Sequence, residues 1–181
     1  GFSRGAYCAR VLAGFLHAFG LMEERNLNLR DYAFRAYKRI DENARPEDYA
    51  ELGLHQRILR PYRPLIRFLG LFDTVSSVIE SGRFLPRLRK HGFTETNPSV
   101  QCVRHAVALD ERRTMFRPQL WPEDQPFDPS PESEGGARPQ DAREVWFTGV
   151  HGDIGGGYPE KRSALAKLPL RWMIDHSREA G

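Results

Sequence analysis

The chain has 181 residues, enough for one domain with a single core and too few for two. Hydrophobic residues make up 40% and charged residues 28%, which excludes intrinsic disorder as a description of the whole chain. The net charge of +3 comes from interleaved basic and acidic residues, so no nucleic-acid partner is indicated. Two cysteines, Cys8 and Cys102, are too few for a disulfide framework, so synthesis in the reducing cytoplasm is expected. No apolar run is long enough to predict a membrane-spanning helix.

The first third of the chain is predicted to be helical. Residues 4–19 carry apolar side chains at helical spacing and are followed by Gly20, which is typical of a helix end. Arg10 and His17 fall off the expected buried stripe, which consists of Val11, Leu12, Phe15, Leu16 and Phe19. Residues 23–62 fit further amphipathic helices interrupted near Pro46. This segment is expected to be either a solvated charged layer or a lid that touches a lipid surface.

Three short apolar runs follow. Residues 65–72 stop abruptly at Asp73, as a buried parallel strand does. Residues 100–109 fit either a strand or a helix and stop at Asp110. Residues 144–151 predict another strand, which ends at His151 before a glycine-rich loop. The last segment, residues 163–176, indicates a helix partly broken at Pro169.

Residues 122–143 have a different composition. Five prolines, a Gly-Gly pair and six acidic residues occur between Pro122 and Asp141, with little to bury. This composition predicts a long surface loop inserted into the domain.

The chain opens on Gly1-Phe2-Ser3-Arg4-Gly5, which matches the G-x-S-x-G pattern. Small residues on both sides of the serine permit a sharp turn from strand to helix that exposes the serine oxygen. Because a helix is predicted to begin at once, its first amides, including that of Arg4, would bind an oxyanion formed on an attacked carbonyl. So short a pattern also occurs in flexible glycine loops, so the hypothesis depends on finding partners for Ser3.

A serine nucleophile needs a histidine to accept its proton and a carboxylate to orient that histidine. His151 is the preferred histidine because it ends a predicted strand and enters a glycine-rich loop. His105 lies in an apolar run and is interpreted as a core histidine bonded to the backbone. The other histidines are less suited, since one lies inside a helix and three lie in charged segments expected to be exposed: His17, His55, His91 and His176.

Asp73 is the preferred orienting acid because it ends the strand predicted over residues 65–72. Its other interpretation is a helix N-cap. Asp110 is the alternative acid, although its charged neighbours could equally form a local ion-pair network with it. The order Ser3, Asp73, His151 is the order found in α/β-hydrolases.

Two other classes of function remain open. His151 and Asp153 leave a metal-dependent hydrolase as one alternative, although two ligands do not define a metal site and a turn role also suits Asp153. A binding module without catalysis is the other, and the intact set of Ser, His and Asp argues against it. The three glycines at residues 155–157 lack the features of a nucleotide-binding loop, so they are expected to let the histidine loop pass close to substrate or to the nucleophile helix. Catalysis by Ser3 requires no cofactor.

Four sequence blocks support the hydrolase interpretation. They are Gly1-Phe2-Ser3-Arg4-Gly5-Ala6-Tyr7, residues 70–75, residues 105–121 and residues 145–158. Together and in this order they resemble the α/β-hydrolase family catalogued as domain of unknown function 2235, which includes phospholipase effectors of bacterial type VI secretion.

The resemblance implies a serine hydrolase of carboxylic esters, of phospholipase A type, with the roles of nucleophile, acid and base carried to Ser3, Asp73 and His151. It also implies an α/β fold with a mostly parallel sheet flanked by helices. Residues 1–181 would form a single partial catalytic domain, the C-terminal part of that fold, without the N-terminal strands and their Asp-Gly-Thr block. The expected partners are an ester or phospholipid substrate, a transient membrane surface, and secretion-system or immunity proteins, with export into target cells. Gly152 departs from the family, which usually has Ser there.

Overall fold

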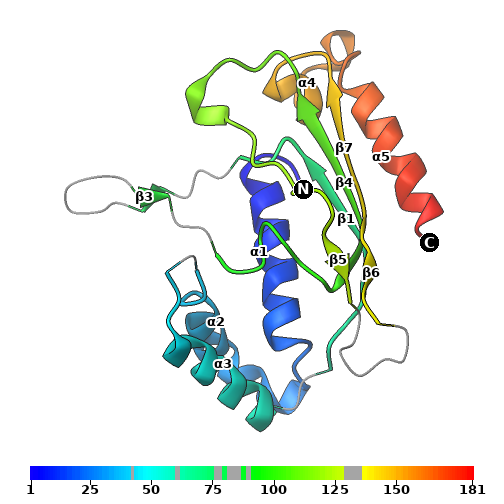
Figure 1. The fold of residues 1–181 in the computed structure, drawn as a ribbon. Coiled ribbons are helices and arrows are strands. Elements are labelled where there is room, and N and C mark those ends of the chain that lie inside the picture. The colour runs from blue at the N-terminus through cyan, green and yellow to red at the C-terminus, as the bar shows by residue number, and fades with distance from the viewer. Residues whose placement is uncertain (42, 60–61, 76–78, 81–86, 89–90, 129–135) are drawn as a thin grey trace.

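The computed structural model describes the chain except for residues 42, 60–61, 76–78, 81–86, 89–90 and 129–135. At its centre lies a parallel sheet of three strands in the order β1 (Ile66–Phe72), β4 (Val100–Ala108) and β7 (Asp141–Phe147) (Figure 1). Phe2 forms a parallel bridge with Phe72, so the first three residues extend the sheet on the free side of β1. This confirms the predicted α/β class with a parallel sheet.

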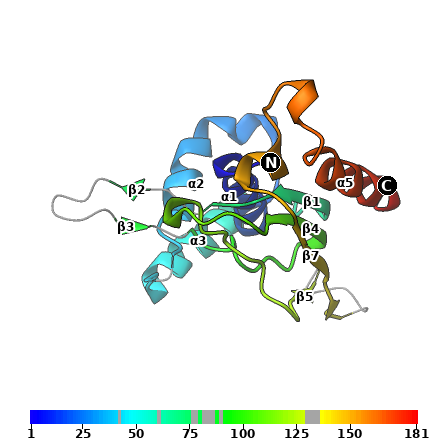
Figure 2. The same cartoon turned by 90° about the horizontal axis from the view of Figure 1, so that it is seen from above.

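Helices cover both faces of the sheet. Helix α1 (Arg4–Phe19) packs against β1, and α5 (Lys167–Glu179) lies on the opposite side of the strands (Figure 2). A second helical layer, η1 (Glu24–Leu29), α2 (Arg30–Tyr37) and α3 (Pro46–Leu59), packs on α1. Because β4 is central, eight of its nine residues are buried, and this explains why residues 100–109 showed no strand alternation.

The buried face of α1 differs from the predicted stripe. Leu12 is 59% exposed, whereas Arg10 is fully buried. The helix has two packing surfaces: small residues face the sheet, and Ala18 and Phe19 pack among α2 and α3. The prediction assumed that α1 has a single buried face, and for this reason it placed Arg10 wrongly. Its guanidinium lies over the ring of Trp121, and its Nη2 donates to the carbonyl of Gln119 at 2.8 Å.

Two predicted boundaries also change. The third strand ends at Phe147, so His151 does not end it but begins a short helix, α4 (His151–Gly155). The last helix begins at Lys167 and runs unbroken, because Pro169 lies in its first turn, where a backbone N–H has no partner within the helix. The predicted interruption near Pro46 is confirmed, since α2 ends at Tyr37 and Pro46 is the first residue of α3.

The predicted loop over residues 122–143 contains regular structure at its ends. β5 (Pro126–Phe127) pairs with β6 (Arg138–Pro139), Phe127 is buried, and β7 already begins at Asp141. Residues 129–135, at the middle of the predicted loop, lie outside the described residues. The remaining short elements are β2 (Ile79–Glu80) paired with β3 (Arg87–Leu88), η2 (Thr114–Phe116) and η3 (Glu160–Arg162). Among the helices of the described part of the chain, none has both the length and the apolar character needed to cross a bilayer.

Candidate active site

Ser3 stands at the junction between the first extended residues and α1. Its backbone adopts φ 56° and ψ −124°, a strained conformation for a residue with a side chain. The Ser3 amide donates to the carbonyl of Phe72 at 3.0 Å, which places Ser3 level with Asp73 at the carboxyl edge of the sheet. A Cβ on Gly1 would lie 2.4 Å from the carbonyl oxygen of Gly5. The turn is therefore too tight for a side chain at position 1, as predicted, whereas a Cβ on Gly5 would meet no atom within 4 Å.

The first turn of α1 faces the same place. Ser3 provides no side-chain cap to the helix, so its hydroxyl is not used to bind the first amides. The carbonyl of Ser3 accepts hydrogen bonds from the amides of Ala6 and Tyr7 and closes the turn. The Arg4 amide therefore belongs to the first, positively polarised turn of a helix that starts at the serine.

Asp73 and His151 are brought together by the fold. His151 Nδ1 lies 2.6 Å from Oδ2 of Asp73, and both side chains are buried. Oδ1 of Asp73 accepts from the amide of Ala108 at 3.0 Å, while the Asp73 amide donates to the carbonyl of Ala106 at 2.7 Å. Asp73 has φ 40°, so the chain turns sharply as β1 ends. A carboxylate held this way orients the imidazole and leaves Nε2 to exchange protons.

The ring of His151 is also enclosed by two phenylalanines. Its centroid lies 4.5 Å from that of Phe2 and 4.6 Å from that of Phe116. The His151 amide donates to Glu111 Oε2 at 3.3 Å. Arg113 binds the same carboxylate at 2.7 Å, and these contacts lower the pKa of Glu111 to about 2. Phe116 and Glu111 were missed from the sequence because nothing in the spacing of residues 111–116 places them near residue 151.

Asp110, the alternative acid, and Asp153, the candidate metal ligand, both accept hydrogen bonds from backbone amides. Asp110 Oδ2 accepts from the amide of Gly149 at 2.7 Å, so Asp110 holds the backbone that leads to His151. Asp153 Oδ2 accepts from the amide of Val150 at 3.0 Å, which confirms the turn role considered for it. Among the described residues, no group of three or more His, Cys, Asp or Glu side chains is placed to hold a metal ion.

A second buried histidine supports the turn at Asp73. His105 Nε2 accepts from the amide of Thr74 at 3.1 Å, which confirms His105 as a core histidine bonded to the backbone. Its Nδ1 lies 2.5 Å from Glu144 Oε2, and that oxygen also accepts from the amide of Trp121 at 2.8 Å. Burial lowers the pKa of His105, so the neutral ring donates through Nδ1. Glu144 was missed, although a carboxylate within an apolar run is a signal that it has a buried partner.

The remaining histidines lie away from these residues. His17 is on α1, where its Nδ1 lies 2.7 Å from the Ser99 hydroxyl. His55, His91 and His176, predicted to be exposed, are instead partly buried.

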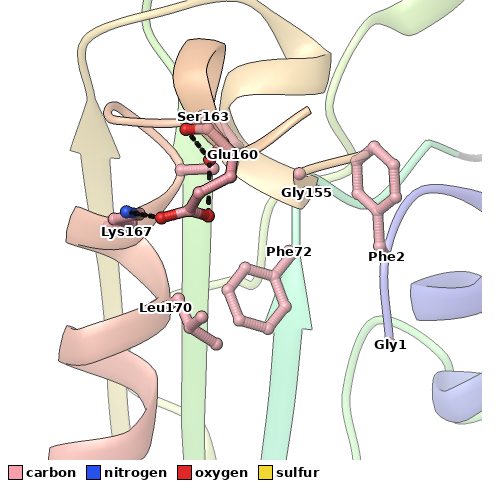
Figure 3. A pocket seen from close by; sticks show the side chains of 11 residues that line it. Gly1, Phe2, Phe72, Gly155, Glu160, Ser163, Lys167 and Leu170 are labelled. Atoms are coloured by element: carbon pink, nitrogen blue, oxygen red, sulfur yellow. Dashed lines mark hydrogen bonds and ion pairs between the residues drawn. The ribbon is translucent and has the colours of Figure 1, made fainter. Parts of the chain in front are cut away.

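A pocket of about 450 Å³ is lined by Gly1 and Phe2, which precede Ser3, and by residues of α4 and α5 (Figure 3). Its apolar wall consists of Phe2, Phe72, Ile154, Ala166 and Leu170. Glu160, paired with Lys167 and Ser163, lies at its rim. A Cβ on Gly155 would lie 2.1 Å from the ring of Phe2. Gly155 therefore lets α4 approach the residue that precedes Ser3, whereas a Cβ on Gly156 or Gly157 would meet no atom within 4 Å, so the predicted close approach applies to one of the three glycines.

Comparison with known proteins identifies the family of the chain. A family model described as "T6SS, Phospholipase effector Tle1-like, catalytic domain" matches residues 1–176. The chain belongs to this family. The match confirms the resemblance to type VI secretion phospholipase effectors.

Individual proteins are also similar to the chain. A yeast protein from Saccharomyces cerevisiae, titled "Uncharacterized protein YEL023C", is 35% identical over 123 residues, which cover 65% of this chain and 17% of that protein. An uncharacterized protein from Pseudomonas aeruginosa superposes with a TM-score of 0.55 at 22% identity, over 99% of this chain and 23% of that one. This superposition supports the fold.

A structure titled as the Tle1 effector bound to the VgrG spike gives a TM-score of 0.39 at 25% identity, over 91% of this chain and 25% of that one, too low to support an argument. The chain thus spans a quarter or less of the length of each of these three proteins.

Proposed function

We propose that this domain is a serine hydrolase that cleaves carboxylic esters of phospholipids, with Ser3 as nucleophile, His151 as general base and Asp73 as the orienting acid. The observation that carries the proposal is the 2.6 Å contact between His151 Nδ1 and Asp73, formed beside a serine held at φ 56°. Membership of a phospholipase effector family supports the lipid substrate.

The proposed reaction begins when His151 Nε2 accepts the hydroxyl proton of Ser3 as Oγ attacks the ester carbonyl. Asp73 accepts a hydrogen bond from the Nδ1–H of His151 and stabilises the imidazolium that forms. The carbonyl oxygen becomes an oxyanion, which the Arg4 amide and the first turn of α1 stabilise. Breakdown of this intermediate transfers the proton from Nε2 to the leaving alcohol and leaves the acyl group on Ser3.

The second half reverses these roles. A water molecule gives its proton to His151 Nε2 and attacks the acyl carbonyl. The second tetrahedral intermediate then releases the fatty acid and returns the proton to Ser3 Oγ. Every proton in this cycle moves between Ser3, His151, the substrate and the attacking water. The cycle therefore needs no cofactor.

The pocket lined by Gly1 and Phe2 is the proposed site for the acyl chain. Its volume of about 450 Å³ and its phenylalanine and leucine walls suit an apolar chain rather than a charged headgroup. Phe2 lies between the pocket and His151, the proposed general base, because it lines the pocket and its ring contacts that of His151.

The test is covalent labelling of the complete protein by a fluorophosphonate, which reacts with activated serines, followed by release of fatty acid from phosphatidylglycerol and phosphatidylethanolamine vesicles. We expect labelling of the natural protein and none of Ser3→Ala or His151→Ala. A folded natural protein that does not label would overturn the proposal. Activity that is abolished by a chelator, without labelling, would favour the metal-dependent alternative.

The family description also supports delivery as a separate proposal: the complete protein is exported into target cells, with secretion-system and immunity proteins as partners. We expect export to require an intact secretion apparatus in the source cell. An active enzyme retained inside such cells would overturn delivery and leave the hydrolase proposal standing.

A further inference from the structure

The segment from Leu109 to Arg117, here called the arginine loop, projects from the carboxyl edge of the sheet beside α4. Its short helical turn, η2, is the green turn at the upper left of Figure 1. Leu109 is 59% exposed and Met115 is 75% exposed. Exposed apolar side chains beside a catalytic centre call for a physical explanation, since solvation of such groups is unfavourable.

Both ends of the arginine loop are tied to the catalytic residues. At its start, the amide of Leu109 donates to the carbonyl of Phe147 at 3.0 Å, on the strand that leads to His151. Just beyond its end, the amide of Gln119 donates to the carbonyl of Thr74 at 2.8 Å, next to Asp73. A surface that contacts the loop would therefore lie near the edge of the sheet that carries Asp73 and His151.

The two acids of the loop bind neighbouring groups of the protein. Asp110, although exposed, accepts from the amide of Gly149, and Glu111 binds the His151 amide and Arg113. Its arginines are exposed, and within the described part of the chain neither Arg112 nor Arg117 forms an ion pair. The exposed surface of the loop thus carries more arginines than acids, together with the apolar Met115, and this combination complements an anionic lipid surface.

We propose that the arginine loop is the surface by which the domain docks on an anionic phospholipid bilayer, with Arg112 and Arg117 contacting lipid phosphates and Met115 entering the interface. Docking there presents the lipid ester to Ser3. This inference rests on the proposed function and identifies the surface from which its substrate is taken.

The test measures partition of the complete protein onto vesicles by sedimentation. Every variant carries Ser3→Ala, so that vesicles are not consumed and binding is measured without catalysis. The double variant Arg112→Gln/Arg117→Gln is expected to bind vesicles of equal phosphatidylglycerol and phosphatidylcholine about 30-fold more weakly. Met115→Ser should weaken binding several-fold at high salt also, because its contribution is apolar. Raising the salt to about 0.5 M should weaken binding of the parent, since the arginine contacts are screened.

The matched control is Arg35→Gln/Arg57→Gln, which removes two exposed arginines from α2 and α3, at the opposite end of the molecule from α4 (Figure 1). These helices are the other candidate lipid surface. If the control variant weakens binding as much as the loop variant, or if the loop variant binds normally, the proposal is wrong. Equal binding to pure phosphatidylcholine would also overturn it. Circular dichroism must show all variants folded. Failure of the docking proposal and failure of the proposed function can be told apart. If the proposed function is wrong, the fluorophosphonate does not label the protein with Ser3 intact, whether or not that protein binds vesicles.

Discussion

His151 and Asp73 meet at 2.6 Å across 78 positions of sequence, although they follow strands that are not neighbours. β4 lies between β1 and β7, so the chain after β7 must cross the end of β4 to reach Asp73. Gly149, at φ 121°, makes this crossing, and its amide is held by Asp110. The contact therefore depends on a turn that few residues other than glycine can adopt.

Asp73→Asn should lower ester hydrolysis by roughly three to four orders of magnitude, because an amide in place of the carboxylate cannot hold the imidazole in its productive tautomer or stabilise the imidazolium. Asp110→Asn is the matched control, since an amide oxygen can still accept from Gly149. It should retain most activity. The measurement is kcat/KM on a soluble ester, and the opposite ranking of the two variants would make Asp110 the acid.

Glu144→Ala should destabilise the protein by about 2–4 kcal/mol, because two buried donors, the Trp121 amide and the His105 ring, lose their acceptor. Glu144→Gln keeps an acceptor oxygen and should lose less. Urea unfolding measures the difference. Equal stability of Glu144→Ala and the natural protein would show that the network does not support the turn at Thr74.

Gly155→Ala should slow fluorophosphonate labelling of Ser3, because its Cβ would lie 2.1 Å from the Phe2 ring and would displace the residue before the nucleophile. Gly53→Ala is the control: no atom lies within 4 Å of its added Cβ, and it sits inside α3. That variant should label normally and gain about 0.5–1 kcal/mol of stability. Normal labelling of Gly155→Ala would contradict the close packing of Phe2 on α4.

Acid should weaken the fold through His17. Burial lowers the pKa of His17 from 6.5 to about 4, so between these values the unfolded chain binds more protons than the folded one. Stability should therefore fall as pH decreases through this window, with His17 contributing about 2 kcal/mol between pH 7 and pH 5. His105, whose pKa is also lowered by burial, contributes in the same direction. Urea unfolding at pH 7 and pH 5 should show that His17→Gln loses less stability on acidification than the natural protein does. An equal loss of stability in the two proteins would exclude His17 as a cause.

Local patterns determined much of this protein. The glycine spacing around Ser3 predicted a tight strand-to-helix turn, and the apolar runs predicted β1 and β7, because both features depend on residues close in sequence. The strand at residues 100–109 stayed ambiguous because burial on both faces removes the alternation that identifies a strand.

Only the tertiary structure decided which distant groups meet. The sequence favoured Asp73 and kept Asp110 as the alternative because both follow predicted apolar runs. The tertiary structure places β4 next to β1, and this brings the Asp73 carboxylate to the amide of Ala108 and to His151. Arg10 appeared to be off the buried face because a single stripe was assumed, whereas α1 packs on the sheet and on α2 and α3 at once. Contacts of this kind depend on strand order and on the direction of loops, which no local spacing encodes.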